Sequence, residues 1–163
     1  MRTPFGTLGK LFPSSVVALL TMLSPPVTAA DFTAVGDIIF HGSVIYQAGG
    51  AEGNYSGQWQ WVQAHLNHAP ITYGNLEGPT DNTQDYSITE KTNGYPFNFP
   101  NKAVMDLVDA GFDVFTTSNN HALDMGAQGV DQTLFFLRRL GIAAAGSVLS
   151  TDDSHGVRRV LDS

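Results

Sequence analysis

Short apolar runs that alternate with helix-like segments constrain this chain more than any other feature. Four runs are rich in β-branched, aromatic or small apolar residues, as buried strands are: residues 32–40, 71–76, 112–117 and 142–145. Three segments between them carry apolar side chains at helical spacing and end before a proline or a glycine: residues 58–69, 101–110 and 127–140. This alternation predicts an α/β fold with mostly parallel strands and crossover helices.

Several local features refine this prediction. Trp59, Val62 and Leu66 should form the buried stripe of the first helix, and Asn101 is a candidate cap for the second. Residues 47–57 are rich in Gly, Asn and Ser, which indicates a loop. Residues 78–100 are polar and irregular, and a loop of that length in a compact domain is often functional.

The first 29 residues resemble a signal peptide. Arg2 and Lys10 precede an apolar run over residues 11–23, and small residues follow at 27–30. The run is short for a membrane span, although an uncleaved anchor stays open as an alternative. We therefore expect an exported protein, periplasmic or extracellular, with membrane association as an alternative, whose folded part occupies residues 31–163.

Composition excludes several classes of site. The sequence has 163 residues, a formal net charge of −7 and no cysteine. The absence of cysteine rules out disulfides and thiolate metal sites, so a metal would need Asp, Glu, Asn or His ligands. No basic patch is visible, and we therefore expect no nucleic acid as a partner.

Polar side chains follow each of the first three predicted strands. Asp37 ends the first, Asn75 and Glu77 end the second, and residues 118–121, S-N-N-H, end the third with Asp124 just beyond. The carboxyl ends of parallel strands meet at one edge of a sheet, so these groups should converge there. Carboxylates, amide oxygens and imidazoles suit a hard or borderline divalent cation, and a pair of such ions can clamp a phosphate ester.

Two of the five histidines are candidate site residues, and the other three are not. His41 lies four residues after Asp37 and is either a further ligand or a turn residue. His121 is placed to protonate a leaving group or to stabilise developing charge. His65 and His68 fall on the predicted helix and should be solvated, and we assign no role to His155.

One run of residues resembles a known family. The sequence S-N-N-H-A-L-D-M-G at residues 118–126 is similar to the signature of CapA-type proteins, the poly-γ-glutamate capsule-synthesis proteins. Four further runs match the same family in the same order: G-D-I-I at 36–39, N-L-E-G-P at 75–79, Y-P-F-N-F-P at 95–100 and A-G-F-D-V at 110–114. The resemblance covers roughly residues 32–147 and corresponds to the N-terminal half of the domain.

The resemblance implies an α/β sandwich related to the calcineurin-like metallophosphoesterases. It implies divalent metal ions (Mn, Fe or Zn), two of them in a complete domain. By position, Asp37 and Glu77 become carboxylate ligands and Asn120 an amide ligand. His121 becomes the catalytic imidazole, and Asn75 either binds a metal or supports a residue that does. Asp124 is expected to orient the motif.

The same resemblance predicts a partial domain. The related enzymes bring further histidines and a second sheet from the other half of their fold, and no match to that half is visible before Ser163. We therefore expect a domain truncated at its C-terminus, with strand edges and apolar faces left uncovered.

Three functional interpretations stay open at this point. The first is a metal-dependent hydrolase that acts on a phosphoester or on the amide bonds of a polyglutamate-like capsule polymer. The second is a non-catalytic accessory protein of capsule polymer synthesis or export, in contact with membrane-bound polymer synthase subunits. The third is a secreted sugar-binding module, which rests only on Trp59 and Trp61.

Overall fold

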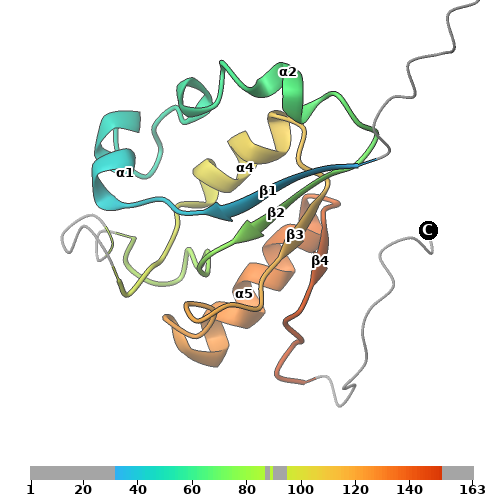
Figure 1. Ribbon diagram of the computed structural model, residues 1–163. Helices are drawn as coiled ribbons and strands as arrows, with labels where there is room; N and C mark the ends of the chain where they lie inside the picture. The colour runs from blue at the N-terminus through green and yellow to red at the C-terminus, as the bar shows by residue number, and fades with distance from the viewer. Residues whose placement is uncertain (1–31, 87–88, 90–94, 152–163) are drawn as a thin grey trace, which may run out of the picture.

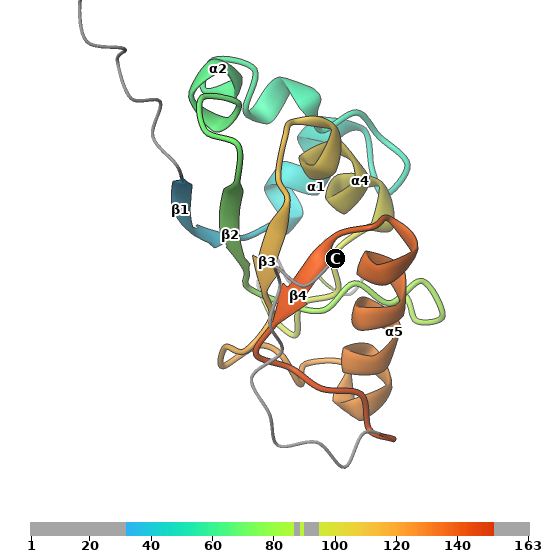
Figure 2. The ribbon, with the colours of Figure 1, turned by 90° about the vertical axis from the view of Figure 1, so that its right-hand side faces the viewer.

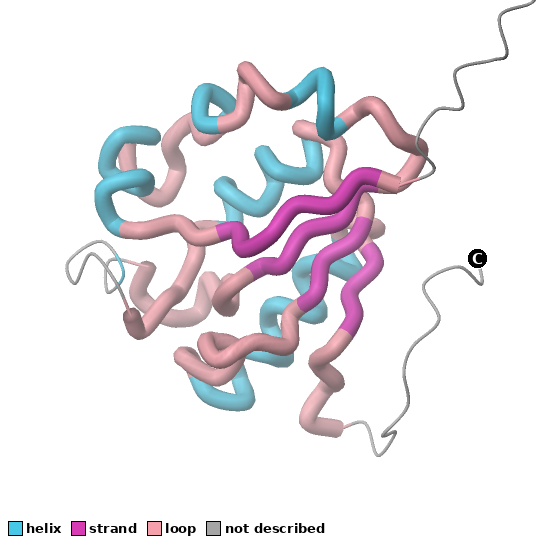
Figure 3. The backbone as a smooth tube through the Cα atoms, viewed as in Figure 1, coloured by secondary structure: helices cyan, strands magenta, loops and turns pink. Residues whose placement is uncertain are grey.

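Four parallel strands form one sheet in the computed structural model, which describes residues 32–86, 89 and 95–151 (Figure 1). The strands lie side by side in the order of the chain: β1 Thr33–Ile38, β2 Thr72–Leu76, β3 Val114–Thr116 and β4 Ala143–Ala145. Each neighbouring pair is parallel, so the carboxyl ends of all four strands lie at one edge (Figure 3). The predicted α/β fold with parallel strands and intervening helices is confirmed.

The helices that join these strands gather on one side of the sheet. They are α1 Gly42–Ala48, the short 3₁₀ helix η1 Ser56–Gln58, α2 Gln63–Leu66, α4 Asn101–Asp109 and α5 Gly126–Arg139. In Figure 2, α1, α4 and α5 lie on the same side of the strands. Within the described ranges, no helix is both long and apolar enough to cross a membrane.

The segment between β1 and β2 differs from the prediction. The helix expected over residues 58–69 is broken into η1 and α2, with turns at residues 59–62 between them. The bonds from Val62 N–H to the Trp59 carbonyl and from His65 N–H to the Val62 carbonyl have the tighter 3₁₀ spacing. Trp and Val are weak helix formers, which explains why the segment does not extend as one α-helix.

Two further details were missed or wrong. Helix α1 was not predicted, although Gly49 ends it with a left-handed φ of 99°. Asn101 does not cap α4, because Pro100 occupies that position and Asn101 is the first helical residue. The Asn101 side chain instead accepts a hydrogen bond from the Thr80 hydroxyl at 2.6 Å.

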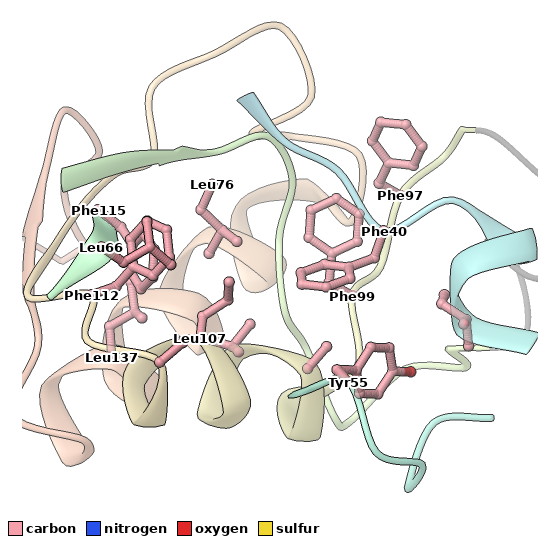
Figure 4. Packing of buried hydrophobic residues seen from close by; sticks show 14 residues of the cluster. Phe40, Tyr55, Leu66, Leu76, Phe97, Phe99, Leu107, Phe112, Phe115 and Leu137 are labelled. Atoms are coloured by element: carbon pink, nitrogen blue, oxygen red, sulfur yellow. The ribbon is translucent and has the colours of Figure 1, made fainter. Parts of the chain in front are cut away.

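The hydrophobic core lies between the sheet and the helices. Alternate residues of β2 (Thr72, Gly74 and Leu76) are buried, as is Phe115 at the centre of β3. A Cβ on Gly74 would lie 2.6 Å from Cδ1 of Ile38 and 2.9 Å from Cε1 of Phe112, so a larger residue here would force these core side chains to shift. Figure 4 shows two aromatic and aliphatic groups on either side of Leu76 and Leu107, the first around Phe40 and Phe99 and the second around Phe112, Phe115, Leu66 and Leu137.

The opposite face of the sheet carries more polar side chains. Tyr73 and Asn75 of β2 alternate with the buried residues and are only partly buried. Asp37 on β1 is exposed, and Thr116 on β3 is partly buried. This face therefore presents to solvent the polar groups that the sequence places near the strand ends.

The loop after β2 is held by buried polar contacts rather than by regular structure. Asp81 and Asn98 are fully buried and exchange two hydrogen bonds: the Asp81 N–H donates to the Asn98 side chain at 2.9 Å, and the Asn98 amide donates to the Asp81 carbonyl at 3.0 Å. The Phe99 N–H donates to the Pro79 carbonyl at 2.8 Å. These contacts fix both described ends of the loop against the carboxyl edge of the sheet.

Some sequence predictions concern residues outside the described part of the chain. The signal peptide at residues 1–29 and His155 both lie outside it. The stripe predicted for the first helix is only partly correct: Leu66 is buried and Trp59 packs against the core cluster, 6.4 Å from the Phe40 ring. Val62 is 48% exposed, because the segment turns at residues 59–62 and does not continue as one helix. Trp61 is 86% exposed.

The core assignment predicts a large stability difference between two phenylalanines. Phe115 is fully buried in β3, whereas Phe135 on α5 is 44% exposed. We expect Phe115→Ala to lower the free energy of unfolding by about 3–5 kcal/mol, since it leaves a cavity that the sheet cannot close. Phe135→Ala should cost about 1 kcal/mol or less. Urea denaturation followed by circular dichroism measures both, and equal losses would contradict the assignment.

Tyr86 makes the free energy of unfolding depend on pH in the alkaline range. Burial raises the pKa of Tyr86 to about 12, and its hydroxyl oxygen accepts a bond from the Asn101 N–H at 3.4 Å. An unfolded tyrosine ionises near pH 10, so the unfolded chain loses this proton first as the pH rises. The free energy of unfolding should therefore fall between about pH 10 and 12.

The variant Tyr86→Phe should remove part of that fall, because it deletes the buried group that resists ionisation. Tyr46→Phe is the matched control, since Tyr46 is 76% exposed. Urea denaturation at about pH 9 and about pH 11 measures the effect. A fall of the same size in wild-type protein and in Tyr86→Phe would show that Tyr86 is not the source.

Candidate active site

One row of register partners brings the predicted site residues of three strands together. Asp37 on β1 is paired in register with Asn75 on β2, and Asn75 is paired with Thr116 on β3. Side chains at paired positions of neighbouring strands point to the same face of a sheet. The three residues therefore lie side by side on the face away from the helices, at the carboxyl end of their strands.

The carboxamide of Asn75 joins two carboxylates. Its Nδ2 donates to Oδ1 of Asp37 at 2.8 Å and also to Oε2 of Glu77. Glu77 is 8% exposed, and Asp37 is exposed. An ionised carboxylate only accepts hydrogen bonds, so the amide must turn its NH₂ group towards the pair. Both predicted carboxylate ligands thus converge on one nitrogen atom.

The oxygen of the Asn75 carboxamide accepts hydrogen bonds from β3 and from the turn that follows it. Its Oδ1 accepts bonds from the Thr116 hydroxyl at 3.0 Å and from Nδ2 of Asn119 at 3.3 Å. The Asn119 amide also donates to the Leu76 carbonyl at 2.8 Å. The structure therefore brings Asn119 against Asn75, whereas the predicted amide ligand Asn120 is exposed.

His121 forms a pair with a carboxylate three residues later. Its Nδ1 lies 2.9 Å from Oδ2 of Asp124, and both side chains are mostly buried, with 20% and 16% of their surface exposed. The same Oδ2 accepts the Phe97 N–H at 2.7 Å, which ties the pair to the long loop. Because an ionised carboxylate cannot donate, Nδ1 carries the hydrogen and Nε2 is the atom left for a substrate.

Aromatic rings surround the imidazole. The centroid of the Phe97 ring lies 4.5 Å from that of His121 and 5.5 Å from that of His41. The exposed Tyr95 ring lies 6.0 Å from His121. Phe97 is thus in contact with both imidazoles, which places His41 at the same edge of the sheet as His121.

The arrangement fits a cation held by few protein ligands. Among the residues that the structure describes, no group of three or more His, Asp or Glu side chains is close enough to hold a metal ion. Asp37 and Glu77 do converge, and each carboxylate has a second oxygen besides the one bonded to Asn75. Two carboxylates with water and substrate oxygens are enough for some divalent ions. The donor set is therefore smaller than the one predicted from the sequence.

Thr116 was not predicted as a site residue, and Asn119 was predicted only as one of the polar residues 118–121 that follow the third strand. Thr116 and Asn119 are the donors that fix the orientation of the Asn75 amide. Thr116 could have been found from the alternation in residues 112–117, because Phe115 faces the core and its neighbour must then face the other side. Asn119 had a weaker signal, since two adjacent asparagines offer no pattern that separates them.

Comparisons with known proteins agree with this part of the sheet. The model of the family described as "Bacterial capsule synthesis protein PGA_cap" matches residues 31–160. The PGA biosynthesis protein CapA of Bacillus subtilis is 32% identical over 131 residues, which are 78% of this chain and 32% of that protein. Two uncharacterized proteins of Sinorhizobium fredii, y4sH and y4uA, are each 31% identical over 116 residues, which are 69% of this chain and 23% of each relative.

The chain thus spans a third or less of the length of these relatives. The match nevertheless includes every strand described above and all residues of the candidate site. On this basis, the protein belongs to the family of bacterial capsule synthesis proteins PGA_cap.

Proposed function

We propose that this chain carries the metal-dependent hydrolase site of an exported protein of capsule polymer synthesis. The observation that carries the proposal is the convergence of Asp37 and Glu77 on the Asn75 amide, at the same sheet edge as the His121–Asp124 pair. One part of this edge offers negative charge for a cation. The other offers an oriented imidazole for proton transfer.

The carboxylates of Asp37 and Glu77 would hold the divalent ion, Mn, Fe or Zn. A bound cation of this kind supplies positive charge that polarises a phosphoryl or carbonyl oxygen of the substrate. Asn75 holds the two carboxylates together without adding charge of its own. His41 and Asn120 are both exposed near this edge and remain proposed ligands.

His121 would act as the acid or base of the reaction. Asp124 fixes the ring through Nδ1, so Nε2 can accept a proton from an attacking group or give one to a leaving group. The bond from the Phe97 N–H to Asp124 holds the carboxylate in turn. This support would fix the ring orientation before a substrate binds.

The substrate class and the cellular location are parts of the same proposal. A phosphoester or the amide bond of a polyglutamate-like capsule polymer has the oxygen that a cation can polarise and the leaving group that an imidazole can protonate. An exported protein would meet that polymer outside the cytoplasm, where membrane-bound polymer synthase subunits are candidate partners. The name of the Bacillus subtilis relative, "PGA biosynthesis protein CapA", supports the link to the polymer.

Metal content tests the proposed cation site at Asp37 and Glu77. We expect wild-type protein purified without chelator and dialysed against Mn²⁺ to retain at least one ion per chain, and Asp37→Asn to lose it. The matched control is Asp109→Asn, which changes the same charge at an exposed position of α4. Elemental analysis measures the ratio, and circular dichroism checks that each variant is folded.

A folded wild-type protein without bound Mn²⁺, Fe²⁺ or Zn²⁺ would remove the hydrolase proposal for this chain. The accessory role in capsule polymer synthesis or export would then be the remaining interpretation. Metal that is retained equally by Asp37→Asn and by the control would instead show that the ion binds at another place.

Hydrolysis assays test the proposed role of the His121–Asp124 pair. We expect Asp124→Asn to lower kcat by about 10²-fold or more, because the amide can donate to Nδ1 and so favours the wrong tautomer of His121. His121→Gln should lower kcat at least as much. The assays use the Mn²⁺-loaded protein with a chromogenic phosphodiester and with a γ-linked glutamyl oligomer, and Asp109→Asn is again the control. Unchanged kcat in both site variants would contradict the role of the pair.

A further inference from the structure

Five side chains form a continuous row of hydrogen bonds across three strands. The row runs from the Tyr73 hydroxyl to the Thr116 hydroxyl at 3.0 Å, from Thr116 to Oδ1 of Asn75 at 3.0 Å, and from Nδ2 of Asn75 to Asp37 and Glu77. We propose that Thr116 and Tyr73 are positioning residues that hold the two carboxylates ready for a cation, acting through Asn75. This inference rests on the proposed function, because it concerns the same cation.

The direction of each bond in the row follows from the chemistry at its end. Asp37 and Glu77 are acceptors when ionised, so both hydrogens of the Asn75 NH₂ point to them and Oδ1 points to β3. Thr116 therefore uses its single hydroxyl hydrogen on Oδ1. It has none left for Tyr73, so the tyrosine must donate to Thr116. Every hydrogen bond in the row is therefore donated in the direction from the tyrosine to the carboxylates.

The backbone sets this row in place. Asp37, Asn75 and Thr116 occupy successive positions of one register row, and Tyr73 precedes Asn75 by two residues on the same strand and face. The Tyr73 ring is held by the Phe32 ring, with centroids 6.0 Å apart. Four members of the row are therefore anchored to strands, and Glu77 directly follows the end of β2, so the row can restrict the Asn75 carboxamide to one orientation.

Restricting that amide has a consequence for the carboxylates. Two like charges repel, and only a donor directed at both keeps them convergent in the absence of a cation. If Thr116 no longer fixes Oδ1, the amide can turn its oxygen towards the carboxylates, where oxygen meets oxygen. Groups that orient metal ligands in this way typically contribute 10–100-fold to metal affinity.

The test replaces the Thr116 hydroxyl without changing the shape of the side chain. Thr116→Val keeps the β-branched form that suits a strand but removes the donor, whereas Thr116→Ser keeps the donor. Titration calorimetry with Mn²⁺ alone on the full chain should give a Kd about 10–100-fold higher for Thr116→Val than for wild-type protein. Thr116→Ser should bind as wild-type protein does. Tyr73→Phe should weaken binding in the same direction, by a smaller factor.

A second measurement needs no metal. In the metal-free protein, the side-chain NH₂ signals of Asn75 in a ¹⁵N–¹H correlation spectrum should shift in Thr116→Val and stay in place in Thr116→Ser. Unchanged signals would show that the hydroxyl does not hold the amide and would overturn the inference. Thermal unfolding of each variant distinguishes these local effects from a general loss of structure.

The outcomes separate this inference from the proposed function. Mn²⁺ binding that Asp37→Asn abolishes, together with an unchanged Kd in Thr116→Val, would overturn the positioning role and leave the metal site standing. A wild-type protein that binds no Mn²⁺ would overturn both. Weaker binding in Thr116→Val that Thr116→Ser restores, at equal unfolding temperatures, is the result that supports it.

Discussion

The hydrogen bonds from the Asn75 carboxamide to Asp37 and Glu77 are the interaction on which the site edge depends. Two carboxylates this close repel, and the protein can hold them together only by placing a donor between them. A lysine would do so by cancelling the charge and would leave nothing for a cation. A neutral amide keeps the carboxylates convergent and leaves their full negative charge in place. Asparagine at this position is therefore compatible with the proposed cation site.

The sheet explains how such distant residues meet. Asp37, Asn75 and Thr116 lie on three different strands, and the parallel register alone puts them in one row. The helices α1, α4 and α5 pack on the opposite face, so the core stabilises the strands without occupying the row. The buried contacts of Asp81 with Asn98 then hold the long loop against the same edge. The core and the row thus use opposite faces of the same sheet.

The sequence was sufficient for the sheet but not for the details of the site. The apolar runs predicted all four strands, because β-branched and aromatic runs bounded by glycine and proline are typical of strands. Their alternation with helical segments predicted the parallel order. Helix α1 was missed because its residues Val44 and Ile45 favour strands as readily as helices. The break between η1 and α2 was missed because apolar spacing alone does not report the 3₁₀ turns around Trp59. The convergence of Asp37, Asn75 and Glu77 followed from topology, whereas the choice of Asn119 over Asn120 depends on the local turn, which no spacing rule describes.

The position of Asn119 has a structural consequence, because this residue links the Asn75 carboxamide to the His121 turn. Its Nδ2 donates to the Asn75 carboxamide and to the Leu76 carbonyl, and its Oδ1 accepts the His121 N–H at 3.1 Å. All polar atoms of this one side chain are therefore used, so its amide has a single favourable orientation. A displacement of the carboxylates would reach the imidazole through Asn119, and a displacement of the imidazole turn would reach Asn75 in the same way. The Asn75 carboxamide and the His121 turn are consequently positioned as one unit, which is the arrangement that the proposed hydrolase would require if a cation and an imidazole act on the same bond.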